Sequence, residues 1–370
     1  MKKCLVFVLT VLFIVSVAAC SKSEPAPAPE VKAPTPSPAA PAAAPAPKAA
    51  APEAAAPAVV DRFYEKEIVY GTADGVELKM DIAKPIGDGP FPAVVCIHGG
   101  GWQIGKRQDF EPTARIMAMN GYVAATVDYR MTPAHKWPAQ IEDVKCAVRY
   151  LRAHAEQLKI NPDKIGALGH SAGAHLALML GLTDPKDNFE GNGGYADQSS
   201  KVQAVVNLSA PTNLSTWKPL PVVDEPLQKE YGKSFDDILA DLLGTADRAA
   251  QAMADASPVT YADESDSPVL TFHGSVDPLV PPDQAKELDE ALKNAGVPHK
   301  LIIIEGADHG FKENQLPNII METTSFFGVH LKGEAPAAAP ATEEAPASTP
   351  ETDEAPASAP ESGEAPAPQS

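Results

Sequence analysis

Residues 165–182 read IGALGHSAGAHLALMLGL, which is an apolar segment, a glycine-flanked serine and a second apolar segment. The first part is typical of a buried strand, and Ala172–Leu182 is typical of a buried helix. Gly169 and Gly173 permit a tight turn between the two elements, and such a turn exposes the hydroxyl of Ser171. Gly-x-Ser-x-Gly also occurs by chance, but its position between a strand and a helix predicts a nucleophilic serine.

On both sides of this turn, strand-like and helix-like segments alternate along the chain. Continuous apolar runs are typical of strands buried on both faces. The expected strands are 67–70, 77–82, 93–97, 122–127, 165–168, 202–208, 269–272 and 301–304, and the expected helices are 110–119, 139–158, 172–182, 235–243, 285–295 and 317–331. The alternation predicts an α/β fold with a mainly parallel sheet and helices on both faces. Residues 213–262 interrupt it and predict a small lid insertion over the carboxyl ends of the strands.

A second motif, His98-Gly-Gly-Gly-Trp102, directly follows one of the expected strands. Consecutive glycines leave backbone amides free of neighbouring side chains, as an oxyanion hole requires. We assign the oxyanion hole to the amides of Gly100 and Gly101, together with that of Ala172 at the start of a helix. Trp102 is a candidate wall of the acyl pocket, and simple packing beneath the glycine loop is the alternative.

A nucleophilic serine needs a histidine as base and an acid that orients this histidine. His309 stands on a loop after an expected strand, and Asp277 follows the strand before it. The candidate catalytic residues are therefore Ser171, Asp277 and His309. Asp283 and Asp308 are competing acids, but Asp283 is expected on the following helix and Asp308 adjoins the histidine.

With these motifs the chain resembles the α/β-hydrolase superfamily, and within it the HGGG esterases related to hormone-sensitive lipase. The closer similarity is to bacterial esterases of the feruloyl and acetylxylan type. The matching segments are His98–Trp102, Gly105–Lys106, Asp128–Arg130, Pro138–Val144, Gly169–Gly173, Gln203–Val206, Ala256–Pro258, His273–Val280 and Gly306–Gly310. Met131 and Asp308 stand where the lipase branch usually has Leu and Gly, which separates the chain from that branch. The resemblance implies an α/β-hydrolase fold and hydrolysis of a carboxylic ester through an acyl-enzyme on Ser171.

The substrate class implied by this resemblance is a short acyl ester, in particular an acetyl or feruloyl group on a polysaccharide. The alternatives are a general small-molecule carboxylesterase, an amidase such as a formamidase, and a non-catalytic surface binding module. Trp217 and Tyr231, in the predicted lid, are candidates for contact with a sugar. The sequence leaves the oligomeric state open.

The composition and the cysteines exclude several other functions. The formal charge is −19, with 49 acidic and 30 basic residues, which argues against a nucleic-acid partner because phosphate contacts need clustered lysine and arginine. No cysteine or histidine spacing indicates a metal site, and we expect no cofactor. Cys96 and Cys146 are expected to be small buried residues, and a disulfide between them is the alternative.

The N-terminus predicts export. Residues 1–19 hold two lysines and then an apolar run that is short for a bilayer span and ends in small residues, which predicts a signal peptide. The end, Val17-Ala-Ala-Cys20, resembles a bacterial lipobox, so we expect a lipid on Cys20 that attaches the protein to the cell envelope. Ser21 after the cysteine favours the outer membrane, facing the periplasm or the surface. An ordinary secretory signal with a chance cysteine is the alternative.

Two flanking segments differ from the rest of the chain. Residues 20–58 and 333–370 contain half of the 38 prolines and no Trp, Tyr, Phe, Ile or Leu. Segments of this composition cannot bury enough apolar surface to offset the entropy of ordering, which predicts a disordered Pro/Ala-rich linker and a disordered tail. The tail is acidic and repeats Glu-Ala-Pro-Ala every ten residues from Glu334. Residues 59–332 remain as the α/β-hydrolase domain.

Overall fold

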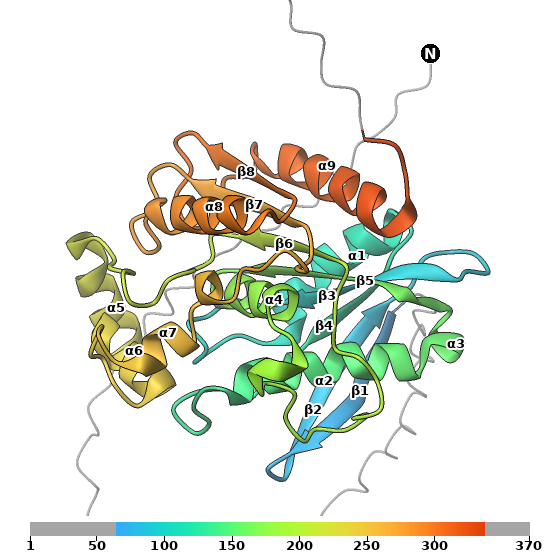
Figure 1. Ribbon diagram of the computed structural model, residues 1–370, viewed down its shortest axis with the longest axis horizontal. Helices are drawn as coiled ribbons and strands as arrows, with labels where there is room; N and C mark the ends of the chain where they lie inside the picture. The colour runs from blue at the N-terminus through green and yellow to red at the C-terminus, as the bar shows by residue number, and fades with distance from the viewer. Residues whose placement is uncertain (1–63, 337–370) are drawn as a thin grey trace, which may run out of the picture. The chain divides into compact units, whose positions relative to one another are not determined.

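The computed structural model describes residues 64–336. The expected signal peptide and linker lie outside the described residues, as does the expected tail beyond residue 336. Eight strands form one sheet in the order β1-β2-β4-β3-β5-β6-β7-β8 (Figure 1). The strands are β1 (Tyr64–Ala73), β2 (Val76–Ala83), β3 (Phe91–Ile97), β4 (Val123–Val127), β5 (Ile160–His170), β6 (Ala204–Leu208), β7 (Val269–Gly274) and β8 (His299–Ile304).

The sheet is mainly parallel, which confirms the predicted fold class. Strands β3 to β8 are parallel to one another, and β2 pairs antiparallel with both β1 and β4. In β3, Ala93, Val95 and Ile97 face one hydrophobic layer, whereas Val94 and Cys96 face the other. The apolar run is continuous because both faces of the strand are covered.

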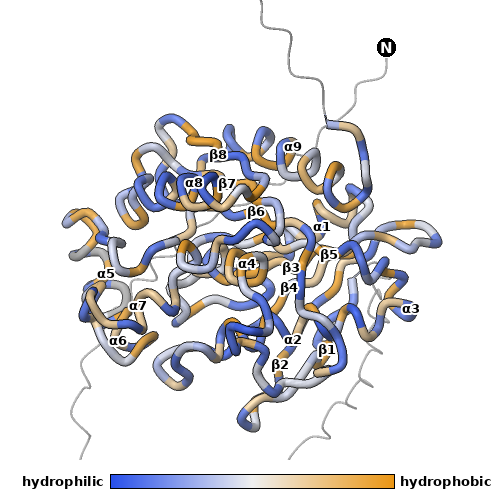
Figure 2. Tube along the Cα trace, viewed as in Figure 1, coloured by the Kyte–Doolittle hydropathy of each residue, from blue (hydrophilic) through white to orange (hydrophobic). Residues whose placement is uncertain are grey.

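Helices cover both faces of this sheet. The helices are α1 (Glu111–Met119), α2 (Ala139–Ala153), α3 (Ala155–Leu158), α4 (Ala172–Leu182), α5 (Asp224–Tyr231), α6 (Phe235–Leu243), α7 (Gln251–Asp255), α8 (Asp283–Ala295) and α9 (Leu316–Phe327). Buried residues of α2, α4 and α8 join one hydrophobic layer, and those of α1 and α9 join the other. Every residue of α4 is buried, and Figure 2 shows this helix as hydrophobic.

Several elements differ from the sequence-based expectation. The expected helix 139–158 is divided into α2 and α3, and Lys159 then takes a left-handed conformation with φ 57° that turns the chain into β5. This strand begins at Ile160, five residues before the expected start. The sequence did not reveal this first part, because it is only partly buried and has no apolar run. The last helix ends at Phe327 and continues as a π-helical segment, Gly328–Lys332.

Cys96 and Cys146 are both buried and both free, so the disulfide alternative is wrong. The two side chains belong to hydrophobic layers on opposite faces of the sheet, and the sheet therefore separates the sulfur atoms. Both behave as small buried residues, as predicted from the sequence.

The segment 213–262 connects β6 to β7 and contains α5, α6 and α7. Figure 1 shows these three helices gathered at one end of the sheet. Helix α6 has the bounds expected from the sequence, and Ser234 caps it by accepting a hydrogen bond from the amide of Asp237. Within residues 64–336 no helix has both the length and the hydropathy that a membrane span requires.

Candidate active site

The turn between β5 and α4 holds Ser171 in an unusual backbone conformation. Its φ of 55° and ψ of −123° are disfavoured for a residue with a side chain, and tight packing around the turn maintains them. A Cβ atom on Gly169 would come within 2.2 Å of the Gly173 carbonyl oxygen. The amide of Ser171 donates to the carbonyl of Leu208 at 2.9 Å. The backbones of Gly169 and Gly173 are thus in close contact, and a side chain on Gly169 would prevent this contact.

A series of hydrogen bonds connects Ser171 to a buried acid. The Nε2 atom of His309 lies 2.9 Å from Ser171 Oγ, and its Nδ1 atom lies 2.7 Å from Asp277 Oδ2. Asp277 is 1% exposed, and its other oxygen accepts from the amides of Leu279 and Val280 at 3.0 and 2.9 Å. These amides hold the carboxylate in one orientation, with Oδ2 directed at the imidazole.

The two competing acids lie elsewhere. Asp283 is the first residue of α8, and its carboxylate pairs with Lys286 at 2.9 Å. Asp308 accepts a hydrogen bond from the amide of Gly310 at 3.1 Å, which keeps its carboxylate within its own loop. Of the three candidate acids, the structure brings only Asp277 into contact with His309.

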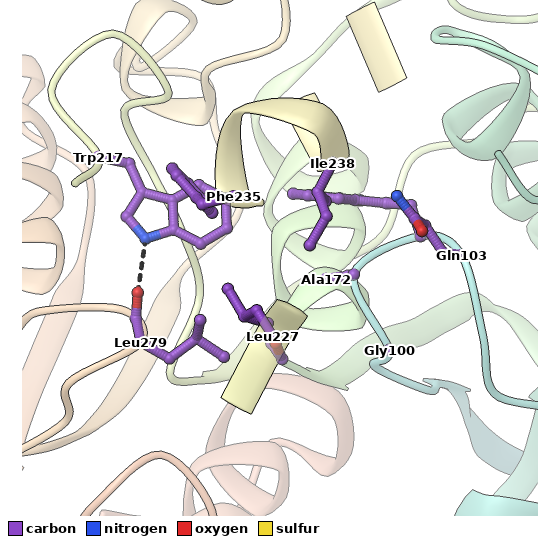
Figure 3. Close-up of a pocket in the computed structure, with 11 residues that line it drawn as sticks. Gly100, Gln103, Ala172, Trp217, Leu227, Phe235, Ile238 and Leu279 are labelled. Carbon is purple, nitrogen blue, oxygen red and sulfur yellow. Dashed lines mark hydrogen bonds between the residues drawn. The ribbon is translucent and has the colours of Figure 1, made fainter. Parts of the chain in front are cut away.

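Ser171 opens onto a small cavity of about 50 Å³ (Figure 3). Its walls come from the glycine loop, the start of α4, the insertion and the loop after β7. The lining residues are Gly100, Gly101, Trp102, Gln103, Ser171, Ala172, Trp217, Leu227, Phe235, Ile238 and Leu279. All three residues assigned to the oxyanion hole thus border the same cavity as the serine.

The glycine loop has a conformation that side chains would prevent. Gly100 and Gly101 have φ of 112° and 58°, and a Cβ atom on Gly100 would come within 2.1 Å of the Ile104 carbonyl oxygen. Trp102 lines the cavity and is also fully buried, with its ring 5.2 Å from that of His175. The ring of Trp102 therefore both lines the cavity and packs in the interior, and its contact with an acyl group stays a prediction.

Two further histidines support the residues around Ser171. The Nε2 atom of His170 donates to the carbonyl of His309 at 2.8 Å, and that of His273 donates to the carbonyl of Val280 at 2.7 Å. Burial lowers the pKa of both imidazoles, and that of His170 falls to about 4. Both are therefore neutral near pH 7 and add no positive charge beside His309. The sequence carries no signal of these backbone contacts.

The insertion contributes one side of the cavity. Leu227 from α5 and Phe235 and Ile238 from α6 line it, together with Trp217 from the preceding loop. Trp217 is only 5% exposed, so it forms a wall rather than an exposed platform for a sugar ring. The side chain of Tyr231, the other candidate for sugar contact, is outside what the structure describes.

Comparison with solved structures defines the class of the fold. An esterase of Thermogutta terrifontis, Est2 with propionate bound, aligns with a TM-score of 0.60 and 29% identity, covering 74% of this chain and 96% of that chain. A truncated carbohydrate esterase from gut microbiota aligns with a TM-score of 0.59 at 23% identity, which shows a shared fold. The domain has the α/β-hydrolase fold of these esterases.

The family follows from the sequence comparison. The BD-FAE family model matches residues 80–292, and the chain belongs to this family. Esterase LipC of Mycobacterium tuberculosis is 30% identical over 255 residues, which cover 67% of this chain and 60% of LipC. The probable carboxylic ester hydrolase LipM of the same organism is 30% identical over 208 residues, 46% of its length. The chain thus spans about half of these relatives, and the predicted resemblance to α/β-hydrolase esterases is confirmed.

Proposed function

We propose that the domain is a serine carboxylic ester hydrolase in which Ser171 is the nucleophile, His309 the base and Asp277 the orienting acid. The observation that carries this proposal is the unbroken series of hydrogen bonds from Asp277 through His309 to Ser171, beside a small cavity. The similarity to proteins named as esterases supports the same reaction.

In this mechanism His309 Nε2 takes the proton of Ser171 while Oγ attacks the ester carbonyl carbon. The amides of Gly100, Gly101 and Ala172 stabilise the negative oxygen of the tetrahedral intermediate. The carbon–oxygen ester bond then breaks, and His309 returns the proton to the departing alcohol. Water attacks the acyl-enzyme in the same way and releases the carboxylic acid. Asp277 holds the proton on Nδ1 and stabilises the transient imidazolium.

The cavity favours a short acyl group. Its volume is about 50 Å³ and its side-chain lining is almost entirely apolar, which suits acetyl or propionyl and disfavours the much larger feruloyl group. Structures of the Thermogutta terrifontis esterase carry propionate and butyrate, which is consistent with a short acyl group here. Within the polysaccharide hypothesis we therefore favour removal of acetyl groups.

The test compares four substrates with the wild-type protein and with Ser171→Ala. Nitrophenyl acetate reports esterase activity, nitroacetanilide reports amidase activity, and acetylated xylan and methyl ferulate report the two carbohydrate-related reactions. We expect hydrolysis of nitrophenyl acetate and release of acetate from xylan, both lost in a folded Ser171→Ala protein. Activity on the small ester alone would favour the general carboxylesterase, and activity on the anilide would favour the amidase. Inactivity on all four substrates would favour the binding module, and hydrolysis by Ser171→Ala would exclude Ser171 as nucleophile.

We also propose that the protein is attached to the bacterial envelope, and specifically to the outer membrane, through a lipid on Cys20. The support is the sequence pattern Val17-Ala-Ala-Cys20 after an apolar run, in residues outside the structural description. Cells labelled with a fatty acid should yield a labelled wild-type protein and an unlabelled Cys20→Ser variant. Labelling of the variant would contradict the proposal. Membrane fractionation tests the location, and we expect the wild-type protein in the outer-membrane fraction.

A further inference from the structure

We propose that Trp217 is a positioning residue that connects the acyl cavity to the orienting acid. This inference rests on the proposed function, because it assigns Trp217 a role in the reaction of Ser171. It assigns the indole a second role besides that of a cavity wall, namely to fix the loop that presents Asp277 to His309.

A single residue, Leu279, contacts both partners through its backbone. The indole Nε1 of Trp217 donates to the carbonyl oxygen of Leu279 at 2.9 Å, as Figure 3 shows. The amide of the same residue donates to Asp277 Oδ1 at 3.0 Å. The indole is thus separated from the carboxylate by one residue and two hydrogen bonds. A further bond joins the same segments, from the amide of Leu220 to the carbonyl of Pro278 at 2.8 Å.

The ring of Trp217 is meanwhile fixed by the cavity. Its centroid lies 4.5 Å from that of Phe235, with an interplanar angle of 76°, and 6.1 Å from that of Trp102. Both are edge-to-face arrangements, which restrict the orientation of an aromatic ring. Leu279 and Trp217 also line the cavity together. An acyl group in the cavity would therefore contact the indole ring of Trp217, and the N–H group of the same ring holds the loop that carries Asp277.

The expected consequence concerns kcat more than KM. Without the indole N–H, the partly buried carbonyl of Leu279 loses this hydrogen bond and the loop can rearrange. Asp277 would then orient His309 less well, and this interaction matters most while the imidazolium forms in the transition state. An ester would still find an aromatic wall if the ring were replaced by phenylalanine. Simple packing by Trp217 would instead change KM or the preference among acyl groups.

The experiment measures kcat and KM of Trp217→Phe on nitrophenyl acetate and nitrophenyl butyrate. We expect kcat to fall about tenfold by the same factor on both esters, with KM within about twofold of the wild type. Trp137→Phe is the matched control, because Trp137 Nε1 has no hydrogen-bond partner in the described part of the chain. This variant should keep the wild-type kcat. A Trp217→Phe kcat within twofold of the wild type, or a loss confined to KM or to one ester, would overturn the inference.

A second variant keeps the inference testable if Trp217→Phe fails to fold. Benzothienylalanine at position 217 keeps the size of the indole and lacks the N–H group, so it should show the same loss of kcat. The low-field proton resonance of the His309–Asp277 hydrogen bond should shift or broaden in both variants and stay unchanged in Trp137→Phe. Ser171→Ala separates the two proposals. If that variant is inactive and the benzothienylalanine protein matches the wild type, only the role of Trp217 fails, whereas an active Ser171→Ala protein contradicts the proposed function itself.

Discussion

The backbone of Gly173 lies so close to that of Ile97 that a Cβ atom on the glycine would come within 2.1 Å of the isoleucine carbonyl oxygen. Ile97 ends β3 immediately before the glycine loop, and Gly173 is in the first turn of α4. This contact therefore brings the Ser171 turn and the oxyanion glycines together. The glycine is required by the close approach of α4 to the end of β3 rather than by its own turn alone.

We predict that Gly173→Ala destabilises the protein and disturbs the alignment of Ser171. The new methyl group must displace backbone atoms of Ile97 and His98, so the free energy of unfolding should fall by about 1–3 kcal/mol or more, with kcat reduced. Urea unfolding and hydrolysis of nitrophenyl acetate measure the two effects. Gly310→Ala is the control, since the nearest atom to its Cβ is 3.9 Å away. Equal unfolding midpoints for both variants would contradict the packing argument.

Asp277→Asn should lower kcat by about 10³-fold or more while the fold is retained, because an amide cannot stabilise the imidazolium and favours the wrong tautomer. Steady-state kinetics at pH 7 tests this expectation. The competing acids supply matched controls, and Asp283→Asn and Asp308→Asn should both retain activity. A greater loss in Asp308→Asn than in Asp277→Asn would reassign the acid.

Enlarging the cavity should change the preferred acyl length. Leu227 lines the cavity from α5, so Leu227→Ala should raise the kcat/KM ratio of nitrophenyl octanoate to nitrophenyl acetate by about tenfold or more. Val222→Ala, in the same insertion but 66% exposed, should leave the ratio unchanged. If the ratio does not respond to Leu227→Ala, the acyl chain lies outside this cavity.

Acid should destabilise the fold in part through His175. This side chain is fully buried, and burial lowers its pKa from 6.5 to about 4. Between these pH values the unfolded chain binds a proton that the folded protein does not bind. The free energy of unfolding therefore decreases as the pH falls from about 6.5 to about 4, by up to about 1.4 kcal/mol per pH unit for this one group.

His175→Gln tests this contribution, because the glutamine amide can replace the imidazole as donor to the carbonyl of Ala256. Urea unfolding at several pH values should give a shallower dependence of the unfolding free energy for the variant than for the wild type. Identical slopes between pH 4 and 6.5 would show that His175 is not buried as a neutral group.

The sequence was most informative where a pattern is local. The serine turn, the glycine loop and α6 are defined by residues within a few positions of each other, so spacing predicted their type and, for α4 and α6, their bounds. The partly buried start of β5 was missed, because a strand with a polar first half carries no apolar run. The division of the expected helix 139–158 was also missed, since it falls at His154, whose φ of −104° and ψ of 21° leave the helical range without any signal in the residue type.

The choice of Asp277 among the three candidate acids was predicted in part from the sequence. The position of Asp277 after an expected strand favoured it, and the structure adds the distance of 2.7 Å to His309 and the two amides that orient the carboxylate. The support that His170 and Trp217 give to this arrangement was beyond the sequence. Both donate to backbone carbonyls far along the chain, those of His309 and Leu279, and every residue type offers the same carbonyl.

The sequence by itself determined the α/β class, the order of the elements and the identity of the candidate nucleophile, base and acid, because these depend on hydrophobic periodicity and on glycine at fixed offsets. Only the tertiary structure decided that Cys96 and Cys146 lie on opposite faces of the sheet, that the cavity is small, and that Leu279 links Trp217 to Asp277. These properties depend on how segments far apart in the chain pack together, and contacts of that kind leave no periodic pattern in the residues that make them.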